Sequence, residues 1–222
     1  MRPRKMQGDY NLEVMEAAVN YRQAVINLFK PYLADCRKIA DFGAGRGTYA
    51  RELTDTWPDI YCIEPARDFW QSCPGLSWLE SLNDLPEQLD AIYTLNVLEH
   101  IEYDEKALTE INRRLSPGGK LFVLVPAHKN LWTEMDNKVG HIRRYSTEEL
   151  TGKVINAGFE VLSTGYFDWV GYLATKAHQV LKGNGSPSVK QIKAFDKVFA
   201  WMQVVRLPEF GKNVYLCGRK LS

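Results

Sequence analysis

The spacing of apolar residues, together with helix start and stop signals, predicts six helices along the chain. In the fourth helix, Ser146 and Glu149 form a capping-box pattern, and Gly158 fits the C-terminal cap. Before the last helix, Ser186 is a cap candidate and Pro187 takes the first helical position. The other five predicted helices span residues 10–33, 48–57, 103–115, 169–182 and 188–205.

Short apolar runs alternate with these helices and predict seven strands. The run at residues 120–126 is continuously apolar, which is typical of a strand buried on both faces of a parallel sheet. Strands that alternate with helices in this way indicate a doubly wound α/β fold. The seven predicted strands span residues 37–43, 59–64, 76–80, 89–95, 120–126, 159–167 and 213–220.

The first strand leads into the glycine-rich loop DFGAGRG. Its alternate glycines permit positive φ and let a ligand approach the backbone closely, although such a loop also suits a plain tight connection. A nicotinamide-binding fingerprint would need its third glycine at position 48, where the chain has Thr48. Glu64 ends the second strand, where an acidic side chain binds ribose hydroxyls in doubly wound nucleotide sites or simply remains solvated.

Taken together, these motifs resemble those of class I S-adenosylmethionine-dependent methyltransferases. The matching pieces are DFGAGRG, IEP, LNVLEHI and INRRLSPGGKLFVLVP, which cover residues 38–126 in the family's order. The resemblance implies an α/β, Rossmann-like, doubly wound and mainly parallel seven-stranded sheet, with a reversed final strand and a helical insertion between strands six and seven. It also implies three parts, namely an N-terminal helical segment 1–36, a methyltransferase core 37–165 and 213–222, and a helical insertion 166–212 that covers the substrate.

The same resemblance implies S-adenosylmethionine as the cofactor. Its sulfonium and ammonium groups are cationic and its ribose is a diol, so carboxylates and backbone groups suit it better than a phosphate cradle. The family often has an aspartate after the third strand, whereas this chain offers Glu80 or Asp84 in a different register. The implied cofactor-binding residues are Asp41, Gly43, Ala44, Gly45 and Gly47 at the glycine loop, Glu64 at the ribose with Pro65 next to it, Glu80, Ser81 and Leu82 at the adenine, and Asn96 beside the cofactor.

The segment after the fifth strand, residues 126–145, is the richest in candidate chemistry. A connection of about twenty residues in a compact domain is usually functional or disordered. His141 is the first candidate for a general base or substrate-orienting group, because an imidazole titrates near neutral pH, and His128 is the second. His141 equally suits a structural hydrogen bond within the loop.

This segment also resembles a branch of the methyltransferases that has PA, LW, D and GH-x-RRY in this order. Members of that branch often occur beside, or fused to, glycosyltransferases, which implies acceptors from glycan, lipid or secondary-metabolite pathways. Arg143 and Arg144 could bind a carboxylate or phosphate with their forked donors, or could pair with Glu134, Asp136 or Glu148. The candidate substrate-binding residues are Trp132, Arg143, Arg144 and Tyr145.

Glu99 and His100 follow the fourth strand in the motif LNVLEHI. In some related O-methyltransferases an E-x-x-E-H arrangement binds a divalent metal. Here Asn96 takes the first position, so one carboxylate is missing and no metal site is expected. His100 remains a candidate active-site residue.

Aromatic residues gather in the two helices predicted between strands six and seven. They suit an apolar or aromatic acceptor, and equally plain packing, a weak membrane-surface contact with a lipid carrier, or a homodimer contact. These residues are Trp169, Tyr172, Phe195, Phe199 and Trp201.

Composition narrows the class of partner and the compartment. The formal net charge of +1 gives no strong field toward nucleic acid or a membrane surface. No apolar run follows the basic N-terminus as in a signal peptide, and no segment approaches the roughly 18 apolar residues of a spanning helix. The four scattered cysteines predict reduced thiols and a cytoplasmic location.

The predicted function is S-adenosylmethionine-dependent methyl transfer to an oxygen or nitrogen of a small-molecule acceptor, such as a glycan, lipid-linked or secondary-metabolite intermediate. The alternative is a non-catalytic, methyltransferase-like module that binds the cofactor or a partner protein. A nicotinamide oxidoreductase is disfavoured by Thr48.

Overall fold

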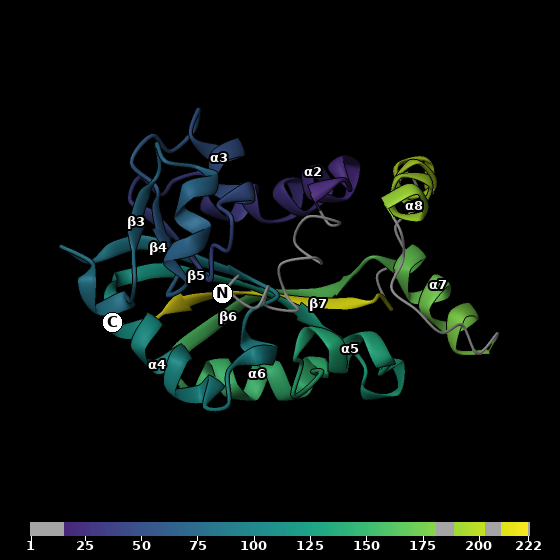
Figure 1. Ribbon diagram of the computed structural model, residues 1–222. Coiled ribbons are helices and arrows are strands. Elements are labelled where there is room, and N and C mark those ends of the chain that lie inside the picture. The colour runs from purple at the N-terminus through teal and green to yellow at the C-terminus, as the bar shows by residue number, and fades with distance from the viewer. Residues whose placement is uncertain (1–15, 181–188, 203–209, 222) are drawn as a thin grey trace, which may run out of the picture.

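The computed structural model describes residues 16–180, 189–202 and 210–221, and its seven strands form one sheet (Figure 1). The strand order is β3-β2-β1-β4-β5-β7-β6, in which β7 is antiparallel to both neighbours and the other pairs are parallel. The predicted fold, with its reversed final strand, is therefore confirmed. The strands are β1 Ile39–Phe42, β2 Tyr61–Ile63, β3 Ser77–Leu79, β4 Leu89–Leu95, β5 Leu115–Pro126, β6 Phe159–Phe167 and β7 Asn213–Lys220.

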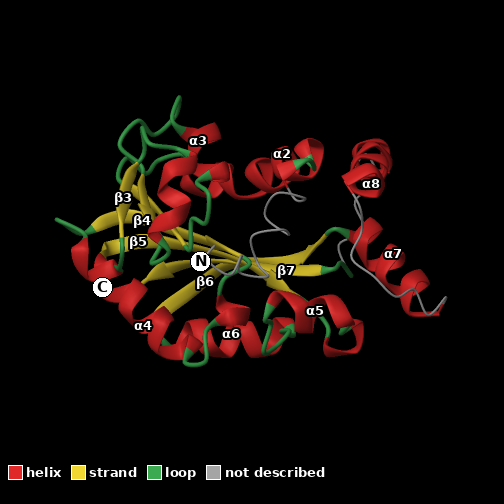
Figure 2. Ribbon diagram, viewed as in Figure 1, coloured by secondary structure: helices red, strands yellow, loops and turns green. Residues whose placement is uncertain are grey.

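Helices cover both faces of this sheet, as Figure 2 shows in red. α4, α5 and α6 lie along one face, whereas α2 and α3 lie over the other, and α7 and α8 form the insertion predicted between β6 and β7. The α-helices are α2 Val19–Phe29, α3 Thr48–Leu53, α4 Asp104–Arg114, α5 Glu134–Val139, α6 Thr147–Asn156, α7 Trp169–Val180 and α8 Val189–Met202. The 3-10 helices are η1 Lys30–Leu33, η2 Arg67–Ser72, η3 Leu82–Asp84, η4 Leu98–His100 and η5 Lys129–Leu131.

The central strands are apolar because helices cover them on both sides. On one face, Phe29 of α2 packs against Tyr93 of β4 and Phe122 of β5, with ring centroids 4.8 and 5.5 Å apart. On the other face, Val123 of β5 shares a buried cluster with Leu108 of α4. Burying one side chain of this size contributes about 1.5–3 kcal/mol, so the two clusters hold the sheet and the strand ends in place.

The first predicted helix, residues 10–33, is interrupted in the structure. The backbone is not helical at Ala18 (φ −90°, ψ 70°), α2 begins at Val19, and the chain continues from Lys30 as a 3-10 helix. Pro31 has no N–H to continue the α-helical bonds, which explains the change at the C-terminal end. Residues 10–15 and the predicted linker signals at 186 and 187 lie outside the described residues.

Asp196 of α8 caps the N-terminus of α2. Ala18 at the N-cap has no side-chain oxygen, and the buried Asp196 carboxylate accepts hydrogen bonds from the backbone N–H groups of Asn20 and Tyr21, at 3.0 and 2.9 Å. The Asn20 amide donates a further bond of 2.8 Å, and the Tyr21 ring lies 5.2 Å from that of Phe199. The helical insertion is thereby joined to the N-terminal segment.

The connection predicted over residues 126–145 contains two short helices, η5 and α5. Thr133 and Asp136 form a capping box at the start of α5, in which the backbone N–H of Thr133 donates to Asp136 Oδ2 at 2.8 Å. Thr-x-x-Asp resembles a helix start signal, so the sequence held a clue to this helix that the interpretation missed. The capping box predicted for Ser146 and Glu149 is confirmed at the start of α6.

β5 begins earlier than the predicted strand 120–126. The S-P-G-G stretch, which separates the predicted helix 103–115 from the predicted strand, lies within β5, where Gly118 has φ +75°. The pairing of β4 with β5 shifts register between Leu89 and Ala91. An irregularity of this kind absorbs the extra residues and lets the chain pass from α4 directly into the sheet.

Candidate active site

Parallel strand ends bring the predicted site residues to one edge of the sheet. β1 leads into Gly43, β2 into Glu64, β4 into Asn96, and β5 into His128. β1, β2, β4 and β5 run in the same direction, so these residues follow carboxyl ends that share an edge. Ligands of doubly wound sheets bind at this edge.

The glycine loop adopts a backbone that other residues would strain. Gly43, Gly45 and Gly47 have φ values of +79°, +53° and +71°. A Cβ atom on Gly43 would lie 2.3 Å from Cγ2 of Val97, well inside van der Waals contact. The N–H groups of Gly43 and Ala44 both donate to the carbonyl of Ile63, at 2.9 and 3.1 Å, which fastens the loop to the end of β2.

Glu64 connects the end of β2 to the glycine loop. Its side chain is buried, and its two carboxylate oxygens accept hydrogen bonds from the backbone N–H groups of Gly45 and Ala66, each at 2.9 Å. A carboxylate oxygen can accept more than one hydrogen bond, so both oxygens of Glu64 keep a lone pair for ribose hydroxyls. Pro65 follows directly and is exposed.

Asp41 is a buried acid beneath the loop, with 3% of its surface exposed. Burial raises its pKa to about 7; the nearby Tyr93 hydroxyl opposes this rise and the neighbouring carboxylate of Glu64 adds to it. No basic side chain among the described residues contributes to this shift. A cation bound nearby would stabilise the ionised form, so the pair of acids suits a cationic ligand.

The residues expected at the adenine are engaged within the protein. Glu80 is exposed and forms an ion pair with Arg67. Ser81 caps η3 in a box with Asp84, and Leu82 is buried in the core. Asn96 has φ +55°, and its N–H donates to the Leu124 carbonyl at 2.8 Å. The role of residues 80–82 toward an adenine ring stays a prediction, as does the place of Asn96 beside the cofactor.

His141 is oriented by Asp136. Nδ1 of His141 lies 2.8 Å from Oδ1 of Asp136, and Arg144 donates to both oxygens of the same carboxylate, at 2.8 and 3.1 Å. Burial raises the pKa of Asp136, but the hydrogen bonds from His141 and Arg144 outweigh it and hold that pKa below its usual value. An ionised carboxylate only accepts, so Nδ1 donates and Nε2 of neutral His141 keeps its lone pair.

Three of the predicted substrate-binding side chains form contacts within the protein. Arg144 is buried and donates to the Ala127 carbonyl as well as to Asp136, so the alternative of pairing with Asp136 is confirmed for it. Arg143 pairs with Asp104 at 2.6 Å, and the Tyr145 hydroxyl donates to the same carboxylate at 2.8 Å. The contacts of Arg143 and Tyr145 hold the G-H-x-R-R-Y loop against the start of α4. A substrate role for the three residues stays a prediction.

His128 lies between two aromatic rings at the end of β5. Its imidazole stacks on Tyr166 of β6, with centroids 4.7 Å apart, and meets Tyr172 of α7 edge-on at 5.5 Å. Nε2 of His128 is buried and has no hydrogen-bond partner in the part of the chain that the structure describes, and burial lowers the pKa of His128. Trp132 lies further along the segment, where its indole N–H donates to Asn137 Oδ1 at 3.0 Å.

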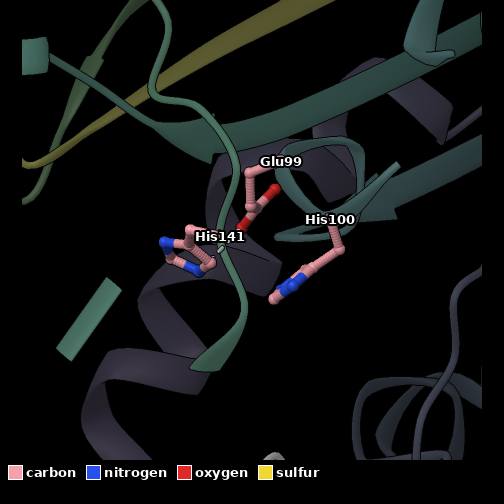
Figure 3. Close-up of side chains that lie close together, drawn as sticks. All are labelled: Glu99, His100 and His141. Carbon is pink, nitrogen blue, oxygen red and sulfur yellow. Dashed lines mark ion pairs between the residues drawn. The ribbon is translucent and has the colours of Figure 1, made fainter. Parts of the chain in front are cut away.

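Glu99 is a buried carboxylate that the sequence placed in a motif but assigned no role. It has no exposed surface, and neither side-chain oxygen has a hydrogen-bond partner among the described residues. Burial raises its pKa to about 8. Its Oε1 lies 3.7 Å from Nε2 of His141, and the His100 ring meets the His141 ring edge-on at 4.8 Å (Figure 3).

A family model described as a methyltransferase domain matches residues 15–164. The chain belongs to this methyltransferase family. The match confirms the predicted class of enzyme, a methyltransferase, and with it S-adenosylmethionine as the cofactor. The carboxylates and the glycine loop described above fit such a cationic nucleoside. No curated protein sequence matches this methyltransferase significantly.

Solved structures with the same fold share little sequence with this methyltransferase. A possible histamine N-methyltransferase from Thermotoga maritima has 22% identity and a TM-score of 0.59, with 94% of this chain and 91% of that chain covered. A SAM-dependent methyltransferase from Archaeoglobus fulgidus has 18% identity and a TM-score of 0.60, with 90% and 94% covered. Phosphoethanolamine N-methyltransferase 2 from Haemonchus contortus, in complex with S-adenosyl-L-methionine, has 12% identity and a TM-score of 0.55, with 84% and 49% covered.

None of the described helices of this methyltransferase combines the length and the apolar character required to cross a membrane.

Proposed function

We propose that this methyltransferase transfers the methyl group of S-adenosylmethionine to an oxygen or nitrogen of a small-molecule acceptor. One observation carries the proposal, namely that the glycine loop and two buried acids share a sheet edge with His128, whose Nε2 has no hydrogen-bond partner among the described residues. A donor site and a proton acceptor on one edge meet the needs of methyl transfer, which depends mainly on aligning two reactants.

The first half of the site would hold the cofactor. When bound, S-adenosylmethionine supplies an electrophilic methyl carbon on its sulfonium. The glycine loop would let the backbone approach the methionine portion, while Asp41 would offset its positive charge. Glu64 would accept hydrogen bonds from the ribose hydroxyls, and Asn96 would lie beside the cofactor. The exposed Pro65 and the backbone of residues 80–82 would flank the adenine.

The second half of the site would serve the acceptor. His141, oriented by Asp136, presents an Nε2 lone pair that can orient the acceptor or take its proton. His128 is the second candidate, because no described residue forms a hydrogen bond with its Nε2. α7 contacts this segment through Gln179, whose amide donates to the Trp132 carbonyl at 3.0 Å. This contact supports a role for the insertion 166–212 as the substrate cover.

The acceptor class rests on the G-H-x-R-R-Y resemblance. We infer an acceptor from glycan, lipid-linked or secondary-metabolite chemistry, with a reacting oxygen or nitrogen. Two of the similar structures are a possible histamine N-methyltransferase and a phosphoethanolamine N-methyltransferase, so amines belong among the acceptors to be tested first.

Calorimetric titration of the full chain with S-adenosylmethionine and with NAD tests the donor site. We expect saturable binding of the first alone, and binding at least tenfold weaker in Glu64→Ala. If a folded sample binds only NAD, or neither ligand, the proposed donor is wrong.

Transfer of a labelled methyl group to a panel of amines and glycosylated or lipid-linked alcohols tests catalysis. We expect His128→Ala and His141→Ala to slow transfer, with His178→Ala on α7 as an exposed histidine control. Cofactor binding without transfer to any acceptor would favour the non-catalytic module.

A further inference from the structure

We propose that Glu99, His100 and His141 form a binding site for a divalent transition-metal ion of the Zn²⁺ class. The sequence motif argued against a metal, because Asn96 takes the place of one carboxylate. The fold brings in a different ligand, since His141 approaches η4 from the loop that follows α5 (Figure 3). The inference goes beyond methyl transfer as such, because it concerns an ion that the donor site does not require.

The three side chains are close enough to share one ion. One ligand atom from each of them lies within 4.8 Å of the others, and Oε1 of Glu99 is 3.7 Å from Nε2 of His141. Ligands at bonds of about 2.0–2.2 Å from one Zn²⁺ lie roughly 3–4 Å apart, so a contraction of about 1 Å would complete the site. Two imidazoles and a carboxylate are also a ligand set that this class of metal binds.

Both histidines are already held as metal ligands usually are. Nδ1 of His141 lies 2.8 Å from Asp136, and Nδ1 of His100 lies 3.2 Å from the carbonyl oxygen of Gly140. Both oxygens accept, so each Nδ1 carries the hydrogen and each Nε2 keeps a lone pair. A carboxylate or carbonyl behind a ligating imidazole sets its tautomer and orientation in metalloproteins.

Glu99 supplies an independent reason to expect a cation. Its side chain has no exposed surface, and both oxygens lack hydrogen-bond partners within the described residues. A buried carboxylate without a partner is strongly unfavourable. A divalent ion held between Glu99 and the two imidazoles would satisfy it directly.

The ion would face the acceptor side of the site. His100 is exposed, and three protein ligands leave a coordination position open, as in catalytic zinc sites. On the function proposed above, an acceptor hydroxyl would bind there and release its proton to solvent more readily. Its oxygen would then form the new bond to the methyl carbon as the carbon–sulfur bond breaks. With the ion bound, His141 would orient the acceptor as a metal ligand, with its Nε2 lone pair on the ion, and would not take the proton itself.

The site is tested by isothermal calorimetry, in which the full chain is first treated with a chelator and then titrated with Zn²⁺ alone. The four cysteines are buried and free, so they offer no accessible thiolate cluster. We expect one ion per chain, with binding at least tenfold weaker in Glu99→Gln, His100→Ala and His141→Ala and unchanged in His178→Ala. Asp136→Asn, behind His141, should weaken binding by about 10-fold.

Unchanged Zn²⁺ affinity in the folded His100→Ala and His141→Ala variants, or no binding by the wild type, would overturn the proposal. His100 is exposed, so its variant keeps the test valid if Glu99→Gln fails to fold. S-adenosylmethionine binding to the same samples separates the two proposals. If that ligand binds and Zn²⁺ does not, the metal site alone is wrong.

Discussion

The two halves of the candidate site are built in different ways. The donor half, around residues 41–47, depends on backbone conformation, with three glycines at positive φ and N–H groups fastened to β2. The acceptor half, around residues 128–145, depends on side-chain charges, with Asp136 holding both His141 and Arg144. Adding a side-chain atom should therefore disrupt the donor half, whereas removing a charged group should disrupt the acceptor half.

The largest effect should come from removing the central charge of the acceptor half. Asp136→Ala would leave the buried guanidinium of Arg144 without its carboxylate, which typically costs about 3–5 kcal/mol of unfolding free energy. Urea denaturation measures the loss. Glu160→Ala, which breaks the exposed pair with Arg219, is the control and should cost less than about 1 kcal/mol. Equal losses in the two variants would contradict the charge-based account.

The donor half should respond most strongly to an added methyl group. Gly43→Ala would place a Cβ atom 2.3 Å from Val97 in a residue with φ +79°, and we expect a loss of about 2–4 kcal/mol. Its affinity for S-adenosylmethionine should fall at least tenfold in calorimetry. Gly152→Ala in α6 meets no atom within 4 Å and should be neutral or stabilising by about 0.5–1 kcal/mol. A tolerated Gly43→Ala would refute the steric account.

Asp41 should make the donor half sensitive to pH. Its pKa of about 7 in the folded protein lies above an unfolded value of about 3.9, so the folded state binds the extra proton between these values. Stability from this residue is therefore lost as the pH rises from about 4 to 7, by on the order of 2–4 kcal/mol. Asp41→Asn should remove this part of the pH dependence of the unfolding free energy, as measured by urea denaturation at pH 5 and at pH 8. If the unfolding free energy of the variant depended on pH as strongly as that of the wild type, Asp41 would not be responsible.

The smallest effect is expected at the exposed rim of the donor half. Arg67→Ala breaks the solvent-exposed ion pair with Glu80, and such pairs contribute at most about 1 kcal/mol. We expect little change in thermal unfolding and no loss of affinity for S-adenosylmethionine. A loss comparable to that of Gly43→Ala would mean that the rim, and not the glycine loop, determines the donor half.

The donor half could be predicted from the sequence because its determinants are local. Short runs of adjacent residues are enough to recognise a glycine loop between a strand and a helix, and an acid at the end of the next strand. The strands 89–95, 159–167 and 213–220 agree with the structure for the same reason, since each is a short run bounded by polar or glycine residues. The start of α2 at Val19 could not be predicted, because its cap comes from Asp196 in α8.

The acceptor half was less predictable because tertiary contacts decide what its side chains do. The sequence offered Asp136 as one of three partners for two arginines, and only the fold assigns it to Arg144 and His141. Likewise, the sequence shows that Glu99 belongs to a motif, but it does not show that its side chain is buried away from solvent. That burial depends partly on the His141 loop, where the Ile142 N–H donates to the Glu99 carbonyl at 2.9 Å.

The capping of α2 by Asp196 has a consequence for the order in which the chain can fold. The two groups are separated by 175 and 176 positions along the sequence. During synthesis, the first turn of α2 therefore cannot be capped by Asp196 until α8 has left the ribosome. Contacts between such distant positions slow folding, because a long loop must close before they form. Early intermediates should thus contain the parallel strands with an α2 that is frayed at its first turn.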